Sequence, residues 1–83
     1  MKAPMFEFEP RWKEELVCSC EFGSFILEMP MGVISVYLPT QPEWEQRAPV
    51  WVRPHWEALR TQLSEWCAQY RYPLYVDASA AVF

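Results

Sequence analysis

Only one long segment of this chain has the apolar spacing of a helix, and it lies between Arg53 and Pro73. The residues that recur at helical intervals there are Trp56, Leu59, Leu63, Trp66, Cys67 and Tyr70. Pro54 suits the first turn of such a helix, and Pro73 ends it. Since one amphipathic helix cannot bury its own apolar stripe, the rest of the chain must supply the surface that covers it.

The segments before and after this helix alternate apolar and polar residues, which is typical of strands. The expected strands span residues 15–22, 25–29, 33–38 and 74–77. Gly23-Ser24 and Pro30-Met31-Gly32 provide turns between the first three, so residues 15–38 predict a three-stranded antiparallel meander. Phe22 and Ile34 are expected on its apolar face.

The predicted fold is therefore α+β, a small and mostly antiparallel sheet in the order β-β-β-α-β with one amphipathic helix packed on one face. Residues 1–83 form a single domain, in which residues 1–10 are either an extended arm or an extra strand that Pro10 stops. Thr40 and Glu43 fit a capping box, which predicts a short helical turn over residues 44–47. The place of the last strand in the sheet stays open, and the apolar residues 78–83 are expected to be docked.

The face of the sheet away from the helix combines apolar and acidic residues. It is expected to carry Val17, Ile26, Val33 and Tyr37 alongside Glu15, Glu21 and Glu28. A surface that is half apolar and half acidic is unusual for a face that only meets solvent.

The net charge of −4 is concentrated in the first half of the chain. Residues 1–45 carry eight Glu against Lys2, Arg11 and Lys13, a balance of −5. This acidity argues against nucleic acid as a partner. It indicates either a solubilising surface or a face complementary to a basic protein.

Nothing in the sequence indicates a secretory signal or a membrane span, and an odd number of cysteines fits a reduced, cytoplasmic environment. Cys18, Cys20 and Cys67 fall on apolar stripes, and with His55 they lack the spacing of a zinc site. Cys67 and His55 are about 18 Å apart along one helix, too far for a catalytic dyad. We therefore expect no cofactor, no metal and no enzymatic activity.

Five tryptophans are many for a chain of 83 residues. Trp56 and Trp66 belong to the helix stripe and are expected in the core. Trp12, Trp44 and Trp51 lie among charges and prolines, where a tryptophan either closes the end of the core or faces a partner.

The segment GSFILEMPMGVISVYLP, the acidic turn with its tryptophan, the Trp66-Cys67 helix and Pro73-Leu74-Tyr75-Val76-Asp77 together resemble a known group. They resemble the small immunity proteins encoded beside bacterial polymorphic toxins and contact-dependent growth inhibition systems. The resemblance covers roughly residues 15–82 and rests on order and composition. It implies a cytoplasmic protein that binds a cognate toxin, often a nuclease, and blocks its active site or substrate cleft.

The leading hypothesis is thus an immunity protein that neutralises a basic toxin domain by occlusion. The residues expected to bind the partner are Glu7, Glu9, Glu21, Glu28, Tyr37, Glu43, Trp44 and Glu45. The alternative is a structural or adaptor protein that self-associates, for instance as a homodimer, through a strand edge and the surface of Val17, Ile26 and Val33.

Overall fold

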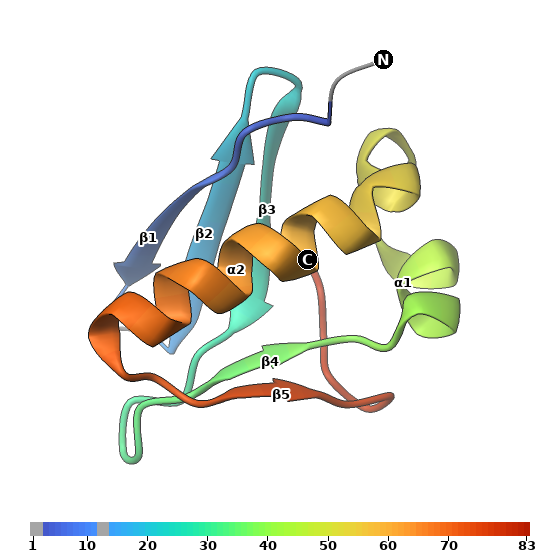
Figure 1. The fold of residues 1–83 in the computed structure, drawn as a ribbon. Helices are drawn as coiled ribbons and strands as arrows, with labels where there is room; N and C mark the ends of the chain where they lie inside the picture. Colours follow the sequence, from blue (N-terminus) through green and yellow to red (C-terminus); the bar gives the residue numbers. More distant parts are fainter. Residues whose placement is uncertain (1–2, 12–13) are drawn as a thin grey trace.

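The computed structural model describes residues 3–11 and 14–83, which form a sheet with helices on one side (Figure 1). Trp12, whose location the sequence left open, lies outside the described residues. The elements are β1 (Glu7–Arg11), β2 (Glu15–Cys20), β3 (Gly23–Glu28), β4 (Val36–Leu38), α1 (Gln41–Arg47), a 3₁₀ helix η1 (Val50–His55), α2 (Trp56–Tyr70) and β5 (Leu74–Val76).

The five strands lie in the order β1-β2-β3-β4-β5, and every neighbouring pair is antiparallel except β4 and β5. The predicted α+β fold with a mostly antiparallel sheet is confirmed. Strand β5 occupies an edge beside β4 and runs parallel to it, because the three helices between them form the long crossover that parallel neighbours require.

The N-terminal segment is a strand and not a free arm. Pro10 does not stop β1, which continues to Arg11 and pairs with β2 along its whole length. A proline is tolerated here because β1 is an edge strand, where the backbone nitrogen of Pro10, which carries no hydrogen, can point away from β2.

The hairpin between β2 and β3 is tighter than the sequence indicated. Cys20 pairs directly with Gly23, so the loop consists of Glu21 and Phe22 alone. The prediction that Phe22 lies on the apolar face is wrong, since its side chain is 57% exposed in this loop.

The strand predicted for residues 33–38 begins only at Val36. Residues 31–34 form a turn, in which Val33 and Ile34 are exposed. Val33 therefore does not lie on the sheet, and the self-association surface predicted for Val17, Ile26 and Val33 does not form as one patch.

Strands β3 and β4 diverge, and the C-terminal residues fill the space between them. The two strands pair only at Glu28 and Tyr37. Beyond that point Leu27 pairs with Val82, and Ile26 exchanges two backbone hydrogen bonds with Phe83, of 3.2 and 2.9 Å. Figure 1 shows this segment running beside β3. The expected docking of residues 78–83, called the tail below, is confirmed.

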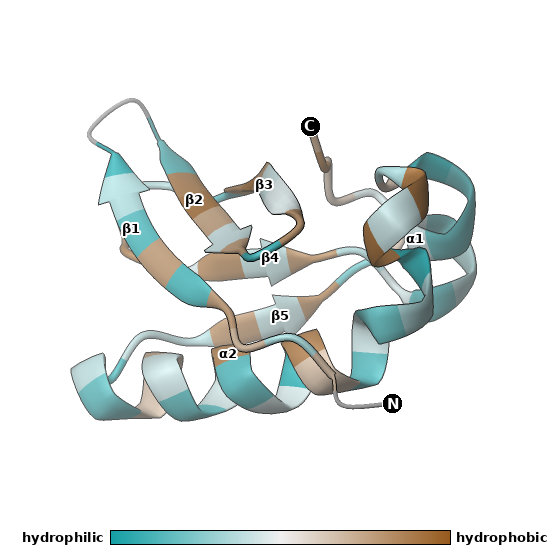
Figure 2. Cartoon of the chain, turned by 90° about the horizontal axis from the view of Figure 1, so that it is seen from above, coloured by the Kyte–Doolittle hydropathy of each residue, from teal (hydrophilic) through white to brown (hydrophobic). Residues whose placement is uncertain are grey.

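The core lies between the sheet and α2, which runs along one side of the strands (Figure 2). Its fully buried members from β2, β3 and α2 include Leu16, Phe25, Leu27, Leu59 and Leu63, and Trp56 of α2 also belongs to it. Tyr70 was expected on the buried stripe but is 53% exposed, because α2 ends there and Arg71 takes a left-handed conformation. Among the described residues, no helix is both long and apolar enough to cross a bilayer.

The backbone conformation of Gly23 provides a test of the β2–β3 hairpin. Its φ of +148° is unfavourable for other residues, and a Cβ there would lie 3.0 Å from a ring carbon of Trp51. We expect Gly23→Ala to lower the free energy of unfolding by about 1–3 kcal/mol. Urea unfolding measures this value.

Gly32→Ala is the matched control, because a Cβ at Gly32 meets nothing within 4 Å. We expect its effect to stay within about 0.5 kcal/mol. Equal effects of the two substitutions would contradict this account of the hairpin.

Candidate partner-binding surface

In the part of the chain that the structure describes, one face of the sheet carries no helix, and it is called the outer face below. Side chains alternate between the two faces of a strand, and those opposite the buried residues point outward. The outward residues with polar or aromatic side chains are Glu7, Glu9 and Arg11 on β1, Glu15 and Ser19 on β2, Ser24 and Glu28 on β3, Tyr37 on β4 and Tyr75 on β5.

The charge of the outer face is predominantly negative. Among the described residues it carries four carboxylates, those of Glu7, Glu9, Glu15 and Glu28, against the guanidinium of Arg11. Arg11 lies 3.6 Å from Glu15, and its side chain is 55% exposed, so this ion pair contributes little to stability. The face therefore attracts cations.

Two tyrosines extend this face across β4 and β5. Tyr37 pairs with Tyr75, and their rings stack with centroids 5.3 Å apart. Tyr37 is half-buried and Tyr75 is 49% exposed. The sequence indicated Tyr37 but missed Tyr75, because its position depends on which strand β5 joins.

The structure brings half of the predicted site residues together. Glu7, Glu9, Glu28 and Tyr37 share the outer face. Glu21 is exposed in the β2–β3 loop, while Glu43, Trp44 and Glu45 belong to α1, of which Glu45 is exposed. The carboxylate of Glu15, already expected on this face, belongs with the first group.

The prediction that Trp44 faces a partner is wrong. Its side chain is fully buried, its ring packs edge-on against Phe25 at 5.3 Å, and its Nε1–H donates to the carbonyl of Val52 at 3.3 Å. Trp51 is half-buried and also packs against Phe25. Both tryptophans close one end of the core.

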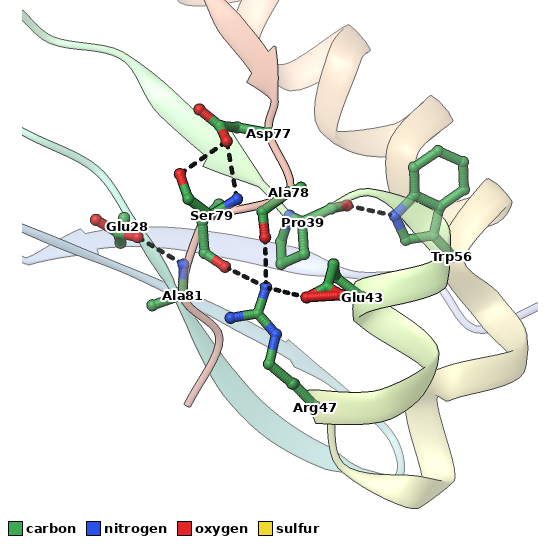
Figure 3. A network of polar contacts seen from close by, with 10 residues as sticks. Glu28, Pro39, Glu43, Arg47, Trp56, Asp77, Ala78, Ser79 and Ala81 are labelled. Atoms are coloured by element: carbon green, nitrogen blue, oxygen red, sulfur yellow. Dashed lines mark hydrogen bonds and ion pairs between the residues drawn. The ribbon is translucent and has the colours of Figure 1, made fainter.

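Glu43 forms an ion pair within the chain (Figure 3). Its carboxylate lies 3.7 Å from Nη2 of Arg47, one turn further along α1. That same nitrogen donates to the carbonyls of Ala78 and Ala80, each at 2.9 Å. Because Arg47 is held by these contacts to the tail, the ion pair of Glu43 contributes to the stability of the fold before it can contribute to partner binding.

Glu28 is also bound to the tail. Its Oε1 accepts a hydrogen bond of 2.6 Å from the N–H of Ala81. Asp77 shapes the turn that leads into the tail, since its Oδ1 accepts from the N–H and the hydroxyl of Ser79. These hydrogen bonds lower the pKa of Asp77. The acidic residues near the tail thus serve its docking, although a carboxylate with one partner keeps acceptor capacity.

The cysteines lie in surroundings that suppress their chemistry. Cys18 and Cys67 are buried. Burial raises the pKa of Cys67 to about 11, and burial with the nearby Cys67 raises the pKa of Cys18 further. Thiols are nucleophiles and metal ligands as thiolates, so these two are inert near neutral pH. Among the described residues, no group of three His, Cys, Asp or Glu side chains could hold a metal ion.

A concave feature lies on the solvent side of α2, away from the outer face. It is a hollow of about 510 Å³ beside Trp56, Glu57, Arg60, Thr61, Ser64 and Glu65. The guanidinium of Arg60 lies 5.7 Å from the ring centre of Trp56. Its charged side chains are two carboxylates and one guanidinium, so its net charge of −1 is smaller than that of the outer face, which carries four carboxylates against one guanidinium among the described residues.

Comparison with protein families, with curated proteins and with solved structures finds no match to this chain. Its function is therefore argued from the surface just described.

The contacts of Arg47 lead to a prediction about the tail. We expect Arg47→Ala to speed amide exchange at Phe83 roughly 5- to 30-fold, because two charge-assisted hydrogen bonds to the tail are lost. Hydrogen exchange followed by NMR measures this rate. Glu43→Gln keeps both hydrogen bonds, so we expect less than a threefold change there. Unchanged exchange at Phe83 in Arg47→Ala would contradict the role given to Arg47.

The burial of the thiols leads to a prediction of how the free energy of unfolding depends on pH. Between the ordinary thiol pKa of 9.0 and about 11, the unfolded chain loses the Cys67 proton while the folded chain keeps it. Stability is therefore full below pH 9 and falls as the pH rises towards 11, by at most about 1.4 kcal/mol per pH unit for each thiol. Urea unfolding from pH 8 to 10.5 measures the slope.

We expect Cys67→Ala to reduce this slope to the contribution of Cys18. Leu63→Ala is the control, since it lowers core stability by about 2–5 kcal/mol without removing a thiol. The same slope in Cys67→Ala as in the unmodified protein would show that Cys67 does not cause it.

Proposed function

We propose that this chain is an immunity protein, which binds a basic toxin domain through its outer face and blocks the active site or substrate cleft of that toxin. The proposal is supported by the family resemblance of residues 15–82 and by the composition of the outer face. It implies a cytoplasmic protein that acts by binding and catalyses no reaction. A nuclease is the favoured toxin, because a cleft that binds phosphates is basic.

The single observation that carries the proposal is the uncovered acidic and aromatic surface of the sheet. A face that meets only solvent needs no stacked tyrosines, whereas aromatic side chains with exposed edges are enriched where proteins bind each other. Four carboxylates against one guanidinium would speed the encounter with a cationic partner. Glu7, Glu9, Glu15, Glu28, Tyr37 and Tyr75 are the contact residues of this proposal.

The test begins with capture of the partner. The tagged protein is used to isolate a stoichiometric partner from cells that produce it, and the partner gene is expressed with and without this chain. The proposal requires a partner that is basic, is toxic when expressed alone, and is neutralised on co-expression. Recovery of self-associated protein alone would favour the structural or adaptor alternative.

The outer face can be tested with two double variants of equal charge change. We expect Glu7→Lys with Glu9→Lys to weaken binding of the captured partner at least tenfold, because two carboxylates of the outer face are reversed. Glu57→Lys with Glu65→Lys reverses two exposed carboxylates on α2, away from that face, and is expected to change affinity less than threefold. Isothermal titration calorimetry at two salt concentrations measures both.

Equal weakening by the two double variants would mean that only net charge matters, and the assignment to the outer face would then be wrong.

A further inference from the structure

One row of the outer face places carboxylates directly beside aromatic rings. Glu15 pairs with Glu28 across β2 and β3, Glu28 pairs with Tyr37, and Tyr37 pairs with Tyr75. Opposed residues on neighbouring antiparallel strands have Cβ atoms about 4.5–5.5 Å apart. A group bound over this row can therefore reach a carboxylate and a ring at once.

Within residues 3–11 and 14–83, the two carboxylates of this row are incompletely neutralised. Like charges directly opposite each other destabilise an antiparallel pair. The ion pair that Arg11 forms there is with Glu15, at 3.6 Å and from an exposed position. Glu28 accepts one backbone N–H, from Ala81, and that N–H carries no net charge. A cation supplied from outside would relieve this repulsion.

We propose that this row, the residues Glu15, Glu28, Tyr37 and Tyr75, binds an arginine side chain of the protein partner. The guanidinium stacks on the face of the Tyr37 ring that is turned away from Tyr75 and donates hydrogen bonds to Glu28 and Glu15. As a statement about the partner, this rests on the proposed function. Arginine is favoured over lysine because its planar group stacks on aromatic rings and binds carboxylates with two parallel hydrogen bonds.

The charge of the face argues against a second copy of this chain as the occupant. A twofold dimer would bring the same surface of both copies together. Four carboxylates against one guanidinium would then oppose an identical set, and like charges in an interface are repulsive. A basic partner has the complementary sign.

The experiment needs no identified partner. A capped Gly-Arg-Arg-Gly peptide and a capped Gly-Lys-Lys-Gly peptide are titrated into the full chain at low salt, and backbone amide shifts are followed by NMR. We expect the arginine peptide to shift the amides of Glu28, Tyr37 and Tyr75 and to bind at least twofold more tightly than the lysine peptide.

The variants separate stacking from charge. We expect Tyr37→Ser to weaken binding of the arginine peptide two- to fivefold, the range for an exposed cation–π contact. Glu28→Gln keeps an oxygen for the N–H of Ala81 and removes the charge. We expect it to weaken binding of the arginine peptide by a similar factor. Tyr70→Ser is the matched control, because Tyr70 is 53% exposed and stacks on Tyr72 at 5.6 Å, away from the outer face.

Equal binding of the two peptides, or equal effects of Tyr37→Ser and Tyr70→Ser, would overturn the arginine site. That failure is distinct from failure of the proposed function, which is decided by capture and neutralisation of a toxic partner. An intact toxin neutralisation with no arginine preference would refute this inference alone. A clear arginine preference without any toxic partner would refute the immunity function alone.

Discussion

The apolar stripe of α2 has one surface against which it can be buried, the inner face of the sheet, and most other features follow from that burial. Leu59 and Leu63 belong to the same core cluster as Leu16 and Leu27. A chain with one long helix covers one face of a small sheet and leaves the other to solvent. The composition of that second face is therefore free to serve binding, since it does not hold the core together.

The divergence of β3 and β4 explains why the C-terminal residues matter to the fold. Pairing at Glu28 and Tyr37 alone would leave most of the β3 edge with unpaired backbone groups, which is a liability for a strand. The tail pairs with Ile26 and Leu27, and Arg47 of α1 donates hydrogen bonds to carbonyl groups of the tail. Residues that look like surface acids in the sequence, Glu28 and Glu43, thus contribute to closing the sheet.

The sequence predicted well those elements whose apolar periodicity extends over many residues. It predicted poorly the positions that depend on a few residues. The helix stripe and the strands around Leu16 and Leu27 were found because alternation and helical spacing extend over many residues. Trp44 was misplaced because prolines on both sides hide the amphipathic character of α1, whose buried residue is Trp44 and whose C-cap, Ala48, is also buried. Tyr75 was missed because it joins the site only through the parallel pairing of β5, which no local pattern encodes.

The outer face shows a conflict between stability and charge that bears on function. Glu15 opposite Glu28 is an unfavourable pair, and a neutral residue at either position would remove the repulsion. Glu28 has a role within the fold, its hydrogen bond from the N–H of Ala81, which an amide oxygen could also accept, although without charge assistance. What an amide could not provide is the negative charge. A repulsion that the fold does not require, beside tyrosines that the core does not bury, supports the proposed cationic partner, which would contact both.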